Sequence, residues 1–182
     1  DEGLEVIQSI REVIDISADH LERLRTQCAT SVLTQQETRT LESKLVRMFC
    51  ELLLNRQNMS SSSLSQSSDG LEISTTTSND DLRQWLRVVG LSQQTINAVI
   101  QHVNSLETLL KMNDDDICAI LNQTFQTEDA RRLVCAINNL KSYQQCLKTG
   151  AEPSDMLWSD SWDRKNNVRL GSSPKISNNR KY

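Results

Sequence analysis

The chain has 182 residues, a formal net charge of −4 and a hydrophobic fraction of 37%. This length suits one or two small domains, and the low hydrophobic fraction predicts that part of the chain lies outside any packed core. The mild negative charge excludes a general attraction to nucleic acid or anionic lipid. The chain has only 5 Gly and 2 Pro, fewer than the turns of a β-rich protein need, so the composition favours an all-α fold.

The first segment repeats apolar residues every seven positions, with further apolar residues three positions later. This pattern is a heptad seam, typical of helices packed at a shallow angle. The seam consists of Ile7, Ile10, Ile14, Leu21, Leu24 and Cys28. Ser17 interrupts it, and Val6 and Val13 add a second apolar edge beside it.

A second helix is predicted over residues 35–57. Thr34 followed by Glu37 is the pattern of a capping box at its start. Its apolar residues fall in steps of four and three, and three more widen the apolar face. The seam residues are Leu41, Leu45, Met48 and Leu52, and the widening residues are Val46, Phe49 and Leu53. A short connection makes the two helices antiparallel neighbours, so we expect a coiled-coil hairpin over residues 1–57.

Two segments are predicted to lie outside packed structure. Residues 58–79 are rich in serine and threonine, which bury little apolar surface, and predict a flexible linker. Residues 149–182 contain both prolines and no helical periodicity, which predicts a disordered tail. The tail has one apolar island, with Leu157, Trp158 and Trp162. This island is either a docking motif or a strip that lies on the folded domain.

Residues 80–148 read as a series of short amphipathic helices. The first contains Trp85, which we expect in a core, and ends at Gly90. The last and longest begins near Thr127. Five helices in this length predict a small bundle.

Catalytic and metal-binding patterns are missing from the sequence. The five cysteines include no C-x-x-C pair, and with no signal peptide at the start we expect reduced thiols. His20 and His102 have no nucleophile and orienting acid that the sequence places beside them, and no glycine-rich phosphate loop occurs. We therefore expect a protein that is not an enzyme and needs no cofactor or metal.

The segment "WLRVVGL", together with "TEDARRLVCAINNL", resembles a sterile alpha motif (SAM) domain. The preceding "IDISADHLERLRTQCATSVLTQQETRTLESKLVRMFCELL" resembles the amino-terminal coiled-coil hairpin of the kinase suppressor of Ras family, where it directly precedes an atypical SAM domain. The resemblance covers residues 4–148. The aromatic positions usual after the first SAM helix are absent here, because residues 92–97 are polar or aliphatic.

The resemblance implies a non-catalytic module of a pseudokinase scaffold in the Ras–Raf–MEK–ERK cascade. Its expected partner is the amino-terminal region of a Raf-family kinase, and its expected location is the cytoplasm with recruitment to the plasma membrane. The alternative is a SAM-mediated homo- or hetero-oligomerisation module that joins pathway scaffolds. No nucleic-acid partner is expected, since neither a basic stripe nor stacking aromatics occur.

Two sets of residues are candidates for protein interaction. The first is the surplus apolar edge of the hairpin, which exceeds what two helices can bury between them and which either contacts a partner or membrane or packs on the SAM-like bundle. It consists of Val6, Val13, Val46, Phe49 and Leu53. The second pairs an acidic run with a basic patch at the start of the last helix, which would allow head-to-tail contact between SAM-like domains. It consists of Asp114, Asp115, Asp116, Arg131 and Arg132.

Overall fold

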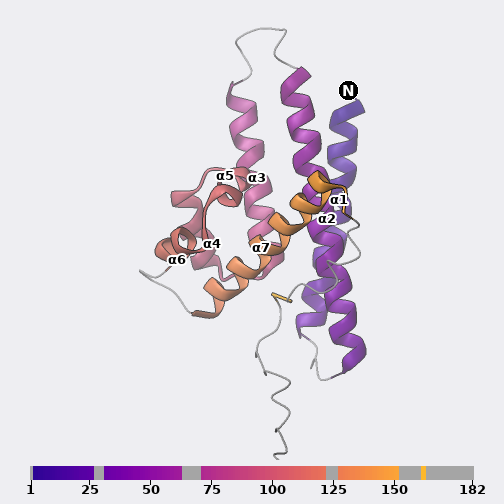
Figure 1. Ribbon diagram of the computed structural model, residues 1–182, viewed down its shortest axis with the longest axis vertical. Helices are drawn as coiled ribbons and strands as arrows, with labels where there is room; N and C mark the ends of the chain where they lie inside the picture. Colours follow the sequence, from indigo (N-terminus) through magenta and orange to yellow (C-terminus); the bar gives the residue numbers. More distant parts are fainter. Residues whose placement is uncertain (1, 27–30, 63–70, 122–126, 152–160, 163–182) are drawn as a thin grey trace, which may run out of the picture.

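The computed structural model describes residues 2–26, 31–62, 71–121, 127–151 and 161–162. Within these ranges the chain forms only helices: α1 (Glu2–Thr26), α2 (Val32–Ser62), α3 (Leu71–Val89), α4 (Gln93–His102), α5 (Leu106–Lys111), α6 (Asp114–Leu121) and α7 (Thr127–Thr149). Figure 1 shows α1, α2 and α3 as three long, roughly parallel rods, with α7 crossing them obliquely. The all-α fold predicted from the sequence is confirmed.

Helices α1 and α2 form the expected antiparallel hairpin. The seam of α1 is buried as the heptad predicts, through Ile7, Ile10, Ile14, Ser17, Leu21 and Leu24. Ser17 keeps its place in this seam, with 2% of its surface exposed, although its hydroxyl has no hydrogen-bond partner among the described residues. A small polar residue therefore does not break the seam, because its neighbours on both sides supply the apolar contact.

The predicted capping box at Thr34 is wrong. Helix α2 begins two residues earlier, and its first turn is closed by the Gln35 amide, which donates to the Ser31 carbonyl at 3.2 Å. Glu37 does not reach back to a cap, because its carboxylate lies 2.9 Å from Nε2 of His20 on α1. A contact across the hairpin thus replaces the local contact that the sequence favoured.

The predicted linker over residues 58–79 is too long at both ends. Helix α2 continues to Ser62, and α3 begins at Leu71. A Cβ on Gly3 would lie 3.4 Å from Cγ and Sδ of Met59, so the last turns of α2 still pack against α1. Tertiary packing of this kind overrides the low helix propensity of serine and threonine. Residues 63–70 of the linker lie outside the described part.

Helices α3 to α7 form the five-helix bundle that the sequence predicted. Polar side chains begin the short helices: Ser92 Oγ accepts from the Thr95 amide at 3.3 Å, and Ser105 Oγ accepts from the Thr108 amide at 3.1 Å. These bonds satisfy amides that a helix leaves open in its first turn. Gly90 ends α3 with a φ of 82°, a conformation that glycine adopts without strain.

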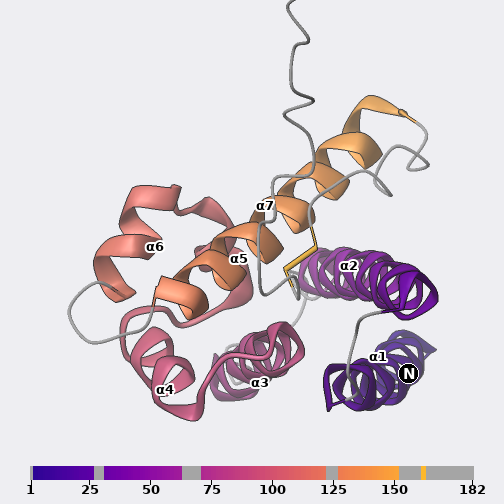
Figure 2. The ribbon, with the colours of Figure 1, turned by 90° about the horizontal axis from the view of Figure 1, so that it is seen from below.

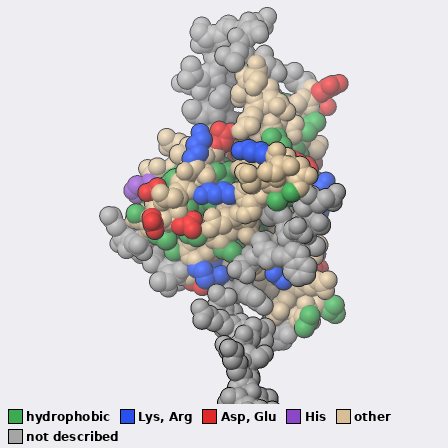
Figure 3. Space-filling model, viewed as in Figure 1, with side chains coloured by type: hydrophobic (Ala, Val, Ile, Leu, Met, Phe, Trp, Pro, Cys, Tyr) green, Lys and Arg blue, Asp and Glu red, His purple; other side chains and the backbone are tan. Residues whose placement is uncertain are grey.

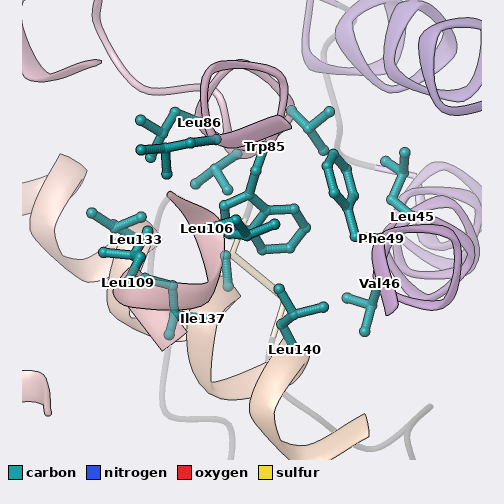
Figure 4. Packing of buried hydrophobic residues seen from close by; sticks show 14 of the residues in the cluster. Leu45, Val46, Phe49, Trp85, Leu86, Leu106, Leu109, Leu133, Ile137 and Leu140 are labelled. Atoms are coloured by element: carbon teal, nitrogen blue, oxygen red, sulfur yellow. The ribbon is translucent and has the colours of Figure 1, made fainter. Parts of the chain in front are cut away.

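The hairpin and the bundle share one hydrophobic core. The ring of Phe49 on α2 meets the ring of Trp85 on α3 edge to face, with centroids 4.8 Å apart and an interplanar angle of 74°. Figure 4 shows these rings between Leu45 and Val46 of the hairpin and Leu140 of α7. Phe49, Trp85 and Leu140 are all fully buried.

Part of the predicted tail belongs to this core. Trp162 is fully buried, and its ring centroid lies 5.8 Å from that of Trp85. The expectation of disorder across residues 149–182 is therefore wrong at Thr149, which is the last residue of α7, and at Ser161 and Trp162. The apolar island contributes at least Trp162 as a strip on the folded domain. The other residues of the island, Leu157 and Trp158, lie outside the described residues.

Phe49→Ala is expected to lower the free energy of unfolding by about 3–5 kcal/mol, because it leaves a cavity where the hairpin meets the bundle. Urea unfolding followed by far-ultraviolet circular dichroism measures this change. Val32→Ala is the control, because Val32 is 77% exposed, and it should change stability by no more than about 0.5 kcal/mol. Equal effects of the two substitutions would contradict a shared core.

Candidate protein-interaction surfaces

Most residues of the hairpin's surplus apolar edge are buried against the bundle. Val46, Phe49 and Leu53 are at most 4% exposed, and all three belong to the shared core. The prediction that these three residues form a docking surface for a partner or membrane is wrong. The alternative expectation, that they pack on the SAM-like bundle, is correct. The physical reason is that the face of α2 turned away from the α1 seam meets α3 and α7, as Figure 2 shows along the helix axes.

The other two predicted edge residues remain at the surface. Val6 is 44% exposed and Val13 is partly exposed. Ile16, which sequence reasoning missed, is 70% exposed. The spacing of seven and then three residues places Val6, Val13 and Ile16 along one side of α1. We call these three residues the α1 edge; it joins the two predicted edge residues that the bundle leaves exposed with Ile16.

A second apolar pair lies at the start of α2. Val32 and Leu33 are each 77% exposed. Figure 3 shows apolar side chains at the lower right, near the end of the hairpin that Figure 1 places there. Sequence reasoning assigned both residues to the connection between the helices and so missed them. The signal was present, because two adjacent apolar residues stood outside any seam.

A buried carboxylate joins the hairpin to the bundle. Asp81 on α3 has a side chain that is 4% exposed, and it forms ion pairs with Arg11 on α1 and Arg56 on α2. The Arg56 pair is bidentate, with Nε to Oδ2 at 3.0 Å and Nη2 to Oδ1 at 3.3 Å. The sequence offered no means of separating Asp81 from its neighbour Asp80, which is exposed, because both precede the same apolar run.

Further polar contacts follow the same junction. Arg25, near the end of α1, donates to the carbonyl of Val88, and Gln84 Nε2 donates to Oδ1 of Asp15 at 2.7 Å. A Cβ on Gly90 would lie 2.8 Å from Cζ of Arg25. Glycine at this position therefore lets the arginine side chain approach the end of α3.

The predicted basic patch is engaged within its own helix. Arg132 is 7% exposed, and its Nε lies 3.2 Å from Oε1 of Glu128. Arg131 donates to both oxygens of Glu128, at 2.8 and 3.2 Å, and to the carbonyl of Trp162 at 3.2 Å. Arg132 is therefore not part of an open basic surface, and Arg131, which is partly exposed, shares the single carboxylate of Glu128 with it.

The acidic run is exposed, as expected for a surface element. Asp114, Asp115 and Asp116 form the first turn of α6 and are all exposed. Figure 3 shows acidic side chains gathered at the left, in the region of α6. Asn113 precedes them and accepts from the Asp116 amide at 2.8 Å, so an asparagine provides the side-chain cap of this helix. Charge at a helix amino terminus is a structural role that these aspartates already fill.

Burial determines the protonation state of Cys50, the one cysteine that is fully buried among the residues that the structure describes. It raises the pKa of Cys50 to about 12, and the adjacent Glu51 carboxylate adds to the shift. Its Sγ lies 3.9 Å from the carbonyl of Leu140. A thiol with this pKa carries no thiolate at neutral pH, so Cys50 is a packing residue.

The described residues hold no group of three or more His, Cys, Asp or Glu side chains placed to bind a metal ion. His20 is exposed and contacts Glu37, and His102 donates from Nδ1 to the Ala98 carbonyl of its own helix at 2.9 Å. Among the described helices, none is both long and apolar enough to cross a membrane.

These features define a class of protein: an all-α module in which a coiled-coil hairpin and a SAM-like bundle share one core. Residues 6–59 match the family model described as the kinase suppressor RAS 1 N-terminal helical hairpin, and residues 68–141 match the SAM like domain present in kinase suppressor RAS 1. No solved structure shows a significant match.

Two curated relatives agree with the family models. The chain is 33% identical over 165 residues to kinase suppressor of Ras 2 of Homo sapiens and 32% identical over 165 residues to that of Mus musculus. Each alignment covers 88% of this chain and 16% of the relative. The chain belongs to the kinase suppressor of Ras family and corresponds to its amino-terminal hairpin and SAM-like domain.

Asp81→Asn is expected to lower the free energy of unfolding by about 1–3 kcal/mol, since it leaves two arginines with a weaker partner at the edge of the core. Thermal and urea unfolding measure the change. The matched control is Asp80→Asn at the exposed neighbouring position, expected to cost no more than about 0.5 kcal/mol. If both variants unfold like the parent chain, the three-helix ion pair does not stabilise the junction.

Glu128→Gln is expected to reduce the loss of stability in acid. Hydrogen bonds from Arg131, opposed by partial burial and reinforced by Arg132, lower the pKa of Glu128 from 4.5. A carboxyl whose pKa is lowered on folding stabilises the protein above its unfolded pKa, and this contribution disappears as the pH falls through the folded pKa. The stability difference between parent and variant, measured by urea unfolding, should therefore be fully present well above pH 4.5 and shrink as the pH falls through 4.5 toward the lower pKa of the folded state. Glu107→Gln, at an exposed position, is the control.

Proposed function

We propose that this chain is a non-catalytic protein-interaction and targeting module of a scaffold in the Ras–Raf–MEK–ERK cascade, and that it binds the amino-terminal region of a Raf-family kinase. Family membership supports the scaffold role. The observation that carries the binding proposal is the α1 edge, where Val6, Val13 and Ile16 remain at the surface while the bundle covers the predicted edge residues of α2.

The α1 edge fits a partner helix better than a small molecule. Its residues follow a seven-residue and three-residue spacing, which is the spacing of a helix–helix seam. Burying an aliphatic side chain of this kind contributes roughly 1.5–3 kcal/mol. Two or three such residues are enough for an anchor, and neighbouring charged residues supply a polar rim.

Recruitment to the plasma membrane is part of the same proposal. An exposed apolar edge on an amphipathic helix can lie in the lipid interface. The support is weaker than for a partner helix, because the side of α1 that carries the edge also carries acidic residues such as Glu2 and Glu12, which anionic lipid repels.

SAM-mediated assembly with other pathway scaffolds is the alternative, and it has less support. The acidic run on α6 is exposed, but its expected basic counterpart is engaged with Glu128. A head-to-tail contact would have to displace that carboxylate from Arg131 and Arg132. The acidic run alone does not define a complementary pair.

The test is binding of the full chain to the amino-terminal region of a Raf-family kinase, measured by isothermal titration calorimetry. The double variant Val6→Asp with Ile16→Asp is expected to weaken binding by about tenfold or more, since it places charge at two anchor positions. Leu147→Asp is the control, because Leu147 on α7 is similarly exposed at 43%. Circular dichroism confirms that helicity is kept.

Undiminished binding of the double variant would exclude the α1 edge as the docking surface. Absence of binding by the parent chain would exclude the Raf proposal itself. Flotation with vesicles that contain phosphatidylserine tests the membrane part separately, and the double variant should then lose flotation while the Leu147→Asp control keeps it.

A further inference from the structure

Ser161 and Trp162 lie against the folded helices although no helix carries them there. Helix α7 ends at Thr149, and Trp162 is nevertheless fully buried beside Trp85. Figures 1 and 2 both show this short gold segment next to α2. We call the pair the tail anchor. The tail anchor resembles a bound peptide more than a part of the helical fold, because the Trp162 side chain inserts into a core that the helices form.

Three helices hold the tail anchor through three different kinds of contact. Trp85 of α3 contacts the indole ring of Trp162, and Arg131 of α7 donates to the Trp162 carbonyl at 3.2 Å. The Ser161 hydroxyl donates to Oε1 of Glu42 on α2 at 2.7 Å. The anchor therefore bridges the hairpin and the bundle at the point where they share their core.

The hydrogen bond between Ser161 and Glu42 requires the free hydroxyl of Ser161, which is the donor. Glu42 is 4% exposed and Ser161 is 9% exposed, so water screens this contact weakly. A phosphate on Ser161 would carry a charge of about −1.5 to −2 at neutral pH and would offer mainly acceptor oxygens. The favourable hydrogen bond would become a repulsion between two anions in a buried site.

A basic side chain that contacts the anchor is already engaged elsewhere. Arg131, which donates to the Trp162 carbonyl, also donates twice to the carboxylate of Glu128. The indole nitrogens of Trp85 and Trp162 are buried without a hydrogen-bond partner among the described residues, which already makes the seated state costly.

We propose that Ser161 is a regulatory modification site, at which phosphorylation releases Trp162 and opens the junction between hairpin and bundle. A serine/threonine protein kinase acts on the transiently released anchor. Ser161 Oγ attacks the γ-phosphorus of ATP and forms a new O–P bond, the bond from that phosphorus to the bridging oxygen of ADP breaks, and the hydroxyl proton passes to the kinase base. The proposal is independent of any Raf partner.

The test uses the full chain labelled with 5-fluorotryptophan at its three tryptophans, with phosphoserine introduced at position 161. Fluorine NMR in H₂O and D₂O reports exposure, since a solvent-exposed ring shows a solvent isotope shift and a buried ring does not. Trp162→Phe assigns the signal. The Trp162 signal of the unmodified chain should show no shift. With phosphoserine the shift should appear, and the seated population should fall on the order of a hundredfold, as expected for unpaired charge in a buried site.

Matched variants separate charge from size. Ser161→Glu should release Trp162. The glutamine side chain has nearly the same shape as glutamate but no charge, so Ser161→Gln should leave Trp162 largely buried. Glu42→Gln combined with Ser161→Glu should restore seating, because one of the two repelling charges is gone. Equal release by the Glu and Gln variants, or a phosphoserine chain whose Trp162 stays buried, would overturn the proposed mechanism.

Phosphopeptide mapping of the chain recovered from cells treated with a phosphatase inhibitor tests whether the modification occurs. Phosphate on Ser161 is expected. Its absence would overturn the assignment of Ser161 as a modification site.

Discussion

The structure depends on the edge-to-face contact of Phe49 with Trp85. One ring comes from the hairpin and the other from the bundle. Their centroids lie 4.8 Å apart in a core that also takes in Leu140 of α7. Because aromatic rings bury large areas and pack in preferred orientations, this contact fixes how the two units meet. The polar contacts of Asp81 and Arg25 lie along the same junction and follow from it.

This junction decides which surfaces remain for partners. It covers Val46, Phe49 and Leu53, the apolar residues that a lone hairpin would expose, and it leaves the α1 edge open. It also places Trp85 where Trp162 can reach it from the tail. A module built this way joins its two parts through one core and leaves two groups of apolar residues of the hairpin at the surface, the α1 edge and the pair Val32 and Leu33.

The helical parts were predictable because their signals are local and periodic. The α1 seam follows a heptad that can be counted in the sequence, and the five bundle helices follow short amphipathic runs. The errors arose where local preference and tertiary contact disagreed. Thr34 and Glu37 form a good capping pattern, but Glu37 pairs with His20 across the hairpin. Serine-rich sequence predicts an early end to α2, but Met59 still packs over Gly3.

The sequence by itself determined the all-α class, the seam of α1, the presence of a hairpin followed by a bundle, and the family. These properties rest on periodicity and composition, which each segment carries alone. Only the tertiary structure decided that Phe49 is core rather than docking surface, that Asp81 is buried while Asp80 is exposed, and that Trp162 belongs to the core. Each of these properties depends on which distant segment packs against the residue, and the local sequence does not specify that segment.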